Sequence, residues 1–446
     1  MKKRLNKTLY ILFAIIILSF SACSLKKEKD EKEVEIVDAK SLIENIVKEN
    51  EKSDKNKDIS KNSDNKISDK DSSNKDKSSK EVKANKEIKD KNKKSKNNLK
   101  TVKIKAFGDI MSHMGQMTYA RNKGGESGYD FSDQFLYIKD FIKDADLSIG
   151  NFETTANPDE PISGYPRFNT DISYPKYLKD AGFDILTTAN NHCLDTGEEG
   201  VFSTIKAIED AGLLHVGTQK ENEDRIIYKT INDIKIAFLS YTYGVNGLES
   251  SVVNVDVDKI VNFLDEDKIE KDIKTAKNND ADFILVYPHW GEEYQSYPSQ
   301  DQIYLARKII DWGADIVIGN HPHVVEPGEF YESKDGRKGF IAYALGNFIS
   351  EQSYDTLGDI RTEQSVAYEI DLSKDMKNGS TTIENVKAHP LWVGRSYNEY
   401  GSSIQTYLIS DFLGNGKNKD LIDQYQEERM RKAQDMVSKI VVEDVE

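Results

Sequence analysis

Histidine, carboxylate and amide side chains gather at five places in the sequence, each directly after a short apolar run. The five motifs are Gly108-Asp109-Ile110-Met111, Gly150-Asn151-Phe152-Glu153, Ala189-Asn190-Asn191-His192, Pro288-His289-Trp290-Gly291 and Gly319-Asn320-His321-Pro322-His323. They contain four of the seven histidines, and a fifth, His113, follows the first motif closely. Neutral imidazole combined with carboxylate oxygen suits Mn, Fe or Zn better than Ca or a thiolate-bound ion. The motifs therefore predict a divalent metal site.

Each motif taken singly has an ordinary structural interpretation. An Asp after a Gly is commonly a turn residue, and an Asn-Asn-His triplet is commonly a polar loop. His321 and His323 alternate along an extended segment, so they point to the same side, as they would on an edge strand. The metal interpretation rests on the five motifs occurring together.

The apolar runs before the motifs predict the strands that position these side chains. The strands are expected at Val102–Phe107, Leu147–Ile149, Ile185–Ala189, Phe283–Pro288 and Ile316–Ile318, with amphipathic helices between them. In open α/β sheets, ligand sites lie beyond the carboxyl ends of the strands. We therefore expect α/β layers in which the five motifs meet at one sheet edge. A hairpin around Asn232-Asp233 and further strands after residue 340 predict a second sheet.

The order of the motifs and their residue types resemble those of the calcineurin-like metallophosphoesterases. With Leu345-Gly346-Asn347-Phe348 added, they resemble the CapA family of capsule or poly-γ-glutamate biosynthesis proteins, from about Lys103 to Ile349. The resemblance implies an α/β fold: a four-layer α-β-β-α metallophosphatase-like sandwich, with the site at the sheet edge.

The resemblance also implies a role for each motif residue. Asp109 and His323 would bind a first metal and Glu153 would bridge two metals. The second metal would be bound by Asn191, His289 and His321. His192, beside Asn191, would be the catalytic acid, so the catalytic pair is His192 and Asn191.

This chain departs from the phosphoesterase pattern at Met111, where those enzymes usually have a histidine ligand. A thioether is a soft, weak ligand for such metals. The expected cofactor is therefore a divalent metal (Mn, Fe or Zn) present as one or two ions, with His113 as an alternative donor.

Two further residues near the motifs have alternative interpretations. Cys193 follows His192 and could be a nucleophile, but a small buried hydrophobe is favoured because free cysteine is among the most buried residue types. Arg167 lies in a loop after the second motif, where it would either clamp a substrate carboxylate or phosphate or be a surface arginine.

Composition divides the chain unevenly. Of 446 residues, 37% are hydrophobic and 31% charged, and from Lys26 to Lys100 there is no aromatic residue, Gly or Pro. Such a segment buries too little apolar surface to offset its ordering entropy, so we expect a disordered N-terminal tether. The net charge of −15 argues against nucleic acid as a partner. Lysines at Lys86–Lys100 leave open local contact with an anionic wall polymer or lipid, although a solvated spacer is favoured.

The N-terminus has the pattern of a targeting signal. A basic stretch, Met1–Lys7, precedes the apolar run Leu9–Ala22 and then Cys23. The small residues before Cys23 resemble the lipobox of bacterial lipoproteins, which implies lipidation of Cys23. The alternative is an uncleaved membrane anchor. Both place the folded domain on the extracellular face of the cell membrane.

These observations predict four segments. They are a signal peptide (1–22), a lipidated Cys and charged linker (23–100), the CapA-like domain (101–392) and a partly helical C-terminal extension (393–446), which either packs on the domain or extends from it.

The resemblance implies a part in synthesis, export or anchoring of poly-γ-glutamate or a capsule polymer. The expected partners are the membrane, the anionic polymer and integral-membrane synthase subunits. Two enzymatic alternatives stay open: a metal-dependent phosphoesterase and a polymer amide hydrolase.

Overall fold

Two sheets form the centre of the computed structural model, which describes residues 98–440. The first sheet has the order β14-β13-β12-β1-β2-β3-β4, with β11 also paired to β1. Its strands are β1 (Leu99–Ile110), β2 (Leu147–Phe152), β3 (Ile185–Thr187), β4 (Leu214–Val216), β11 (Asn347–Ile349), β12 (Gln364–Asp375), β13 (Thr381–Asn398) and β14 (Gly401–Leu408). The signal peptide, Cys23 and the linker up to residue 97 lie outside the described residues.

The second sheet has the order β5-β6-β7-β8-β10-β9. Its strands are β5 (Ile227–Ile231), β6 (Ile234–Thr242), β7 (Phe283–His289), β8 (Ile316–Ile318), β9 (Gly328–Glu332) and β10 (Lys338–Ala342). The predicted hairpin joins β5 and β6, with Asn232 and Asp233 both at positive φ (51° and 64°). Two-residue turns with positive φ at both positions match the twist of paired strands.

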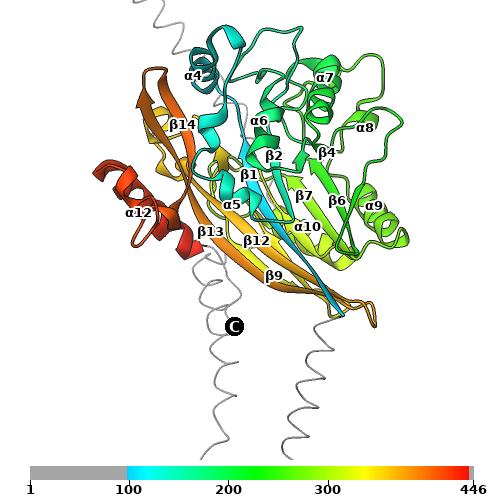
Figure 1. Ribbon diagram of the computed structural model, residues 1–446. Coiled ribbons are helices and arrows are strands. Elements are labelled where there is room, and N and C mark those ends of the chain that lie inside the picture. Colours follow the sequence, from blue (N-terminus) through cyan, green and yellow to red (C-terminus); the bar gives the residue numbers. More distant parts are fainter. Residues whose placement is uncertain (1–97, 441–446) are drawn as a thin grey trace, which may run out of the picture. The chain divides into compact units, whose positions relative to one another are not determined.

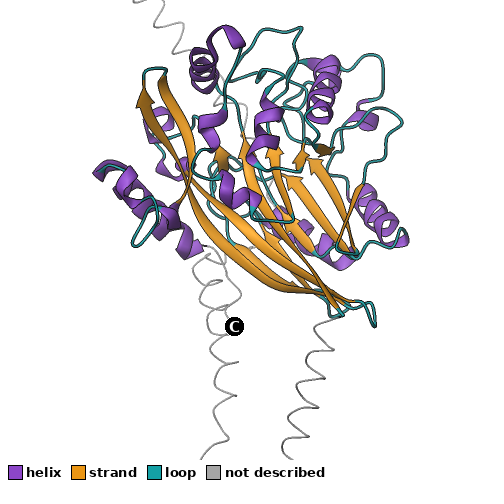
Figure 2. Ribbon diagram, viewed as in Figure 1, coloured by secondary structure: helices purple, strands orange, loops and turns teal. Residues whose placement is uncertain are grey.

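The two sheets pack face to face, and helices cover their outer faces (Figures 1 and 2). Alternate residues of β1, such as Val102 and Ile104, share one apolar core with Phe238 and Leu285 of the second sheet. The outer face of the first sheet is covered by α4 (Met114–Gly124), α5 (Lys139–Lys143), α6 (Tyr174–Ala181) and α7 (Gly197–Asp210). On the second sheet, α9 (Glu266–Asn278) and α10 (Gln300–Trp312) pack on the opposite outer face. The predicted four-layer α-β-β-α sandwich is therefore confirmed.

The parallel strands bring the predicted motifs to one edge. β1, β2, β3 and β4 pair in parallel, as do β6, β7 and β8. Their carboxyl ends therefore point the same way within each sheet. Glu153, after β2, lies beside His289 of β7 and His323 after β8, so both sets of strand ends meet on the same side of the sandwich.

The first sheet continues past residue 392, where the sequence predicts the end of the domain. β13 crosses that position. β14 pairs with β13 from the residue pair Leu391 and Leu408 to the pair Asn398 and Gly401. The alternation of apolar and polar residues does not predict this part of the strand, because the exposed positions of β13 carry polar residues. The helix α12 (Gln424–Ile440) then packs through Met430, Ala433 and Val437, which are all buried. The C-terminal extension is thus part of the folded unit.

Short helical elements complete the fold. The segment Ser132–Lys143 forms a 3-10 turn at Ser132–Phe135 followed by α5, and Phe135, Ile138 and Ile142 enter one core. Small helices also occur at α8 (Val257–Ile260) and α11 (Tyr354–Leu357). Within residues 98–440, no helix has the length and apolarity needed to cross a bilayer.

Candidate metal centre

All five motifs lie where the sequence places them, at the carboxyl ends of strands. Asp109 is the last residue but one of β1, Glu153 follows β2, His289 ends β7, and His321 and His323 follow β8. All five side chains are buried, with exposed fractions from 0% to 4%. Buried charged and imidazole groups of this kind are rarely tolerated without a partner that compensates their desolvation.

Two of the motif glycines permit close approach of the backbone. A Cβ at Gly108 would lie 1.8 Å from the carbonyl oxygen of Gly346, and a Cβ at Gly319 would lie 1.8 Å from that of Tyr343. Any side chain there would push apart the strand ends that carry the metal-type residues. These glycines therefore serve the site by packing and not by turn formation.

The five side chains form two sets that share one carboxylate. Glu153, His289 and His321 make one set, and Asp109, Glu153 and His323 make the other; in each, one ligand atom per residue lies within 4.8 Å of the others. Glu153 Oε1 is 3.5 Å from His289 Nε2 and 3.8 Å from His323 Nε2. A carboxylate between two imidazoles from different strands has the position that a bridging ligand in a two-metal site needs.

Unsatisfied atoms in the centre fit a bound cation. Glu153 Oε1 and His321 Nδ1 are buried and have no hydrogen-bond partner. Burial and the neighbouring Asp109 hold the pKa of Glu153 well above its usual value. Burial and the adjacent histidines hold the pKa of His289 well below its usual value and lower that of His321 to about 3. Neutral imidazoles beside a carboxylate that lacks a counter-charge are the donor set that Mn, Fe and Zn take.

The backbone of the His321–His323 segment is strained. His321 has φ 104° and His323 has φ 59°, a region that non-glycine residues seldom adopt. Such strain persists where the surrounding structure enforces it, commonly at functional sites. Here it turns both imidazoles toward the carboxylates.

Asn191 and His192 lie on opposite sides of the same turn. The amide oxygen Oδ1 of Asn191 lies 2.8 Å from His289 Nε2, beside the set that contains Glu153, His289 and His321. His192 is instead bonded through Nδ1 to Asp195 Oδ2 at 2.7 Å. Asp195 also accepts from the amide N of Phe168 at 2.6 Å, and the Phe168 ring packs edge-on against His192. A carboxylate on Nδ1 fixes the tautomer and leaves Nε2 for proton transfer.

Arg167 and Cys193 lie beside this pair. Arg167 is exposed, and its Nε donates to the carbonyl oxygen of Asp195 at 2.6 Å. The exposed guanidinium is thus held by the residue whose carboxylate binds His192. Cys193 is buried, and burial raises the pKa of its thiol to about 12, which agrees with the hydrophobe interpretation.

Met111 and His113 lie outside both sets. The thioether Sδ of Met111 accepts a weak bond from Ser350 Oγ at 3.5 Å, and His113 Nε2 lies 3.0 Å from the same hydroxyl. Burial lowers the pKa of His113 to about 3. Asn347 lies beside the set formed by Asp109, Glu153 and His323, with its Oδ1 3.1 Å from His323 Nδ1. His113 therefore does not replace the donor that Met111 lacks.

Several site residues were not singled out from the sequence. Asn151 donates to Asp109 at 2.8 Å and lies 3.3 Å from His289 Nδ1, so it connects the two sets. Asn151 and Asn347 stand inside motifs already quoted, and Asp195 comes one helical turn after His192. The exposed Glu293 forms a further set with His321 and His323. In the sequence, Glu293 could have been noticed because a Glu-Glu pair directly follows His289-Trp290-Gly291.

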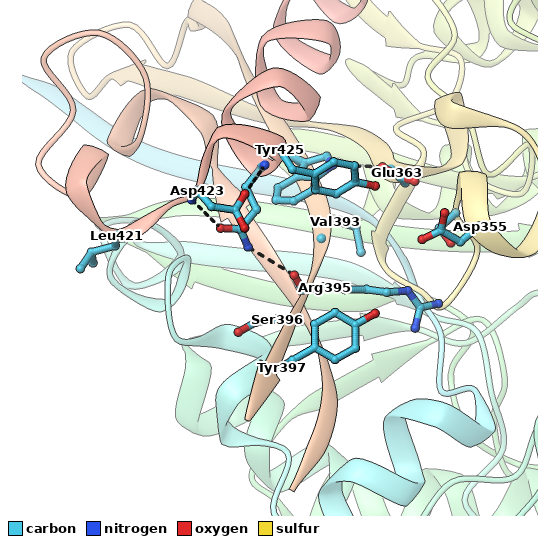
Figure 3. A pocket seen from close by; sticks show the side chains of 13 residues that line it. Asp355, Glu363, Val393, Arg395, Ser396, Tyr397, Leu421, Asp423 and Tyr425 are labelled. Atoms are coloured by element: carbon cyan, nitrogen blue, oxygen red, sulfur yellow. Dashed lines mark hydrogen bonds between the residues drawn. The ribbon is translucent and has the colours of Figure 1, made fainter. Parts of the chain in front are cut away.

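A separate hollow of about 430 Å³ lies between β13 and the C-terminal segment (Figure 3). Its walls include the acidic Asp355, Glu363 and Asp423 and one arginine, Arg395. That guanidinium is already engaged, 3.6 Å from Glu351 Oε1. The hollow contains none of the metal-type sets and has few free positive groups for an anion, so it is distinct from the centre.

Comparison with known proteins gives matches over the same region. The family model described as "Bacterial capsule synthesis protein PGA_cap" matches residues 103–352. The chain is 32% identical to the capsule biosynthesis protein CapA of Bacillus anthracis, over 63% of this chain and 65% of that protein. It is 31% identical to the PGA biosynthesis protein CapA of Bacillus subtilis, over 62% of this chain and 68% of that protein. The chain thus spans about two thirds of the length of these relatives.

Among solved structures, the calcineurin-like phosphoesterase YfkN from Bacillus subtilis is similar with a TM-score of 0.42 and 14% identity. That alignment covers 75% of this chain and 99% of the other.

Proposed function

Because this chain belongs to the bacterial capsule synthesis protein family PGA_cap, we propose that it acts in synthesis, export or anchoring of a poly-γ-glutamate-type capsule polymer. The observation that carries the proposal is the match of one family model to residues 103–352, the segment that contains every metal-type motif. Relatives named for capsule and PGA biosynthesis support it.

The buried centre supports a metal-dependent role within that function. Asp109, Glu153, His289, His321 and His323, with Asn191, would hold one or two divalent cations, for which we propose Mn, Fe or Zn. A cation bound there supplies Lewis-acid activation of a carbonyl or phosphoryl group. His192, oriented by Asp195, would hold or deliver a proton, and Arg167 would orient an anionic group of the polymer.

We further propose that the domain works at the extracellular face of the membrane, attached through a lipid on Cys23. The basic and apolar residues before Cys23 support this attachment. Its partners would be the membrane, the anionic polymer and integral-membrane synthase subunits.

Complementation tests the capsule function. A host strain lacking this chain would be supplied with the native sequence, with His289→Ala, or with the control His215→Ala, whose imidazole lies 3.0 Å from the carbonyl oxygen of Thr218 and belongs to none of the described ligand sets. We expect native protein and His215→Ala to restore surface polymer, measured as released glutamate, and His289→Ala to fail. Full polymer without the chain would overturn the proposed function.

A second candidate, a hydrolase, is favoured by one arrangement: a carboxylate shared by two ligand sets beside the His192–Asp195 pair. Metal-loaded protein would be offered an aryl phosphodiester and purified poly-γ-glutamate. Release of the aryl alcohol would indicate a phosphoesterase, and shortened polymer an amide hydrolase. His192→Ala should keep the metal and lose turnover, and protein that processes neither substrate is not a hydrolase of these classes.

A further inference from the structure

The loop between β7 and α10 carries a carboxylate over the open side of the centre. Glu293 offers an oxygen that lies with one ring nitrogen each of His321 and His323 so that all three atoms are within 4.8 Å of one another. The two imidazoles are buried and Glu293 is exposed. Its neighbour Glu292 is also exposed and belongs to none of the sets within residues 98–440.

This loop is fastened to the segment that carries the imidazoles. The amide N of Tyr294 donates to the carbonyl oxygen of Pro322 at 2.8 Å, and Pro322 separates His321 from His323. The amide N of Trp290 donates to Asn320 at 3.0 Å. Glu293 is therefore bracketed by two backbone bonds to the very turn whose side chains it faces.

The backbone on both sides of Glu293 has unusual dihedral angles. Gly291 has φ 89°, and Tyr294 has φ 64° although it carries a side chain. A Cβ at Gly291 would lie 2.7 Å from the side chain of Gln302. The hydroxyl of Tyr294 accepts from Gln352 Nε2 at 3.4 Å. Positive φ on both sides of Glu293 marks a strained path that holds this exposed carboxylate near the two imidazoles.

Independent of the loop, the centre has a buried ring nitrogen without a partner. His321 Nδ1 is in a side chain that is only 4% exposed, and it has no partner. Met111 contributes no hard donor, since its thioether lies against Ser350. The centre therefore has a free imidazole nitrogen at His321, and no hard donor at position 111.

We propose that Glu293 is a metal ligand that closes the solvent side of the centre together with His321 and His323. The inference rests on the proposed metal-dependent role. A carboxylate is a harder donor than the thioether of Met111, so it suits Mn or Fe at an oxygen-rich site. It also adds a third negative charge beside Asp109 and Glu153, which neutralises more of the charge of the bound cations. Because Glu293 is reached from solvent, it would control exchange of the ion.

Metal binding by two neighbouring variants tests the proposal. Full-length chain, purified in detergent and stripped with EDTA, would be compared with Glu293→Gln and with the matched control Glu292→Gln. Both variants remove one negative charge from adjacent exposed positions. Mn²⁺ affinity and stoichiometry would be measured by calorimetry and by electron paramagnetic resonance, and the thermal midpoint of each metal-free protein would show that it is folded.

We expect Glu293→Gln to keep the metal-free midpoint and to weaken at least one Mn²⁺ site by about tenfold or more, since even residues that only support ligands contribute about 10- to 100-fold. Glu292→Gln should bind like the native protein. Equal affinity and stoichiometry in Glu293→Gln would overturn the inference and leave the capsule function intact. Equal weakening in both variants would also overturn it, because the effect would then be general electrostatics. A native chain that binds no Mn²⁺, Fe²⁺ or Zn²⁺ would overturn the metal role as well.

Discussion

Glu153 is the residue on which the two ligand sets depend, because it belongs to both and is fully buried. Without a cation, its ionised form would have only Asn151 as a nearby donor, at 3.3 Å. A bound ion replaces that missing compensation. It also ties together chain segments that are far apart in sequence, so binding must stabilise the folded state.

This stabilisation gives a prediction for the imidazoles. Chelation should lower the melting temperature of the native protein, and added Mn²⁺ or Zn²⁺ should restore it, since a hundredfold excess over the dissociation constant contributes about 2.7 kcal/mol. His289→Ala and His321→Ala should lose both the metal and this response in differential scanning calorimetry. His215→Ala and His389→Ala, at histidines outside the sets, should keep them. A native domain indifferent to chelators would show that the centre binds no ion.

Glu326 gives a separate prediction about pH. This buried carboxyl has one partner, Gln302 Nε2 at 2.9 Å from Oε2, while Oε1 has none. Burial raises its pKa from 4.5 to about 8. The unfolded chain therefore releases this proton at lower pH than the folded chain, so the stability associated with it is complete below about pH 4.5 and is lost as pH rises through 8.

Glu326→Gln should remove that loss. Measured by urea unfolding, the variant should gain about 3 kcal/mol relative to the native protein between pH 5 and pH 8, because one pKa unit corresponds to about 1.4 kcal/mol. The absolute stability also includes a constant cost for the new buried amide, so only the change with pH is diagnostic. Glu332→Gln, at an exposed position of β9, should leave the pH dependence unchanged. Parallel pH profiles for the native protein and Glu326→Gln would contradict the argument.

The sequence predicted the residues at strand ends better than those contributed by loops. Asp109, Glu153, His289, His321 and His323 follow apolar runs, so strand polarity alone places them at one edge. Asp195 and Glu293 reach the site through turns whose dihedral angles no residue pattern fixes, and Asn347 reaches it from the start of the short strand β11. The failed alternative at His113 has the same origin, since its direction depends on Ser350 far along the chain.

At the scale of elements, β1 shows why the alternation of apolar and polar residues alone does not predict which side chains are buried. Its Val-Lys-Ile-Lys alternation predicts one apolar and one polar face. In the structure Lys105 is fully buried, with Nζ 2.7 Å from the carbonyl oxygen of Phe141 and 3.3 Å from Glu369. The helix α5 covers the face that the pattern assigned to solvent. The long Lys105 stem tolerates this because its charge is paired at the helix end.

The helix α12 gives a prediction at this scale. Arg429 forms a two-bond pair with Glu363, and both side chains are less than a tenth exposed. Arg429→Ala would leave Glu363 buried with only Trp392 Nε1 and the amide N of Tyr354 as donors. Removing one partner of a buried pair costs about 3–5 kcal/mol.

Urea unfolding should show this loss for Arg429→Ala. The matched control is Arg431→Ala, because Arg431 pairs with Glu427 on the exposed face of the same helix and such pairs contribute little. If Arg429→Ala unfolded like Arg431→Ala, α12 would not be coupled to the sheet through this pair.

At the scale of the whole molecule, the family assignment concerns residues 103–352, whereas the folded unit continues through β14 and α12. The remaining elements widen the first sheet and cover its end, but none of the metal-type sets within residues 98–440 draws on them. If the lipid attachment at Cys23 is as proposed, we expect that metal binding at the centre and location in the cell can each be removed without the other.

Cys23→Ala should separate them. If Cys23 carries the lipid that we propose, the variant should leave the membrane fraction and appear in the medium, as judged by immunoblotting of cell fractions. Purified Cys23→Ala should still bind the metal, because the variant leaves Asp109, Glu153 and the imidazoles of the ligand sets unchanged. Cys193→Ala, at the other cysteine, should stay with the membrane, and His289→Ala should stay there without its metal.

Surface polymer should fall in both Cys23→Ala and His289→Ala, for different reasons: the first has an intact centre in the wrong place, and the second an empty centre in the right place. A Cys23→Ala protein that still sediments with the membrane would show that something other than this thiol holds it there.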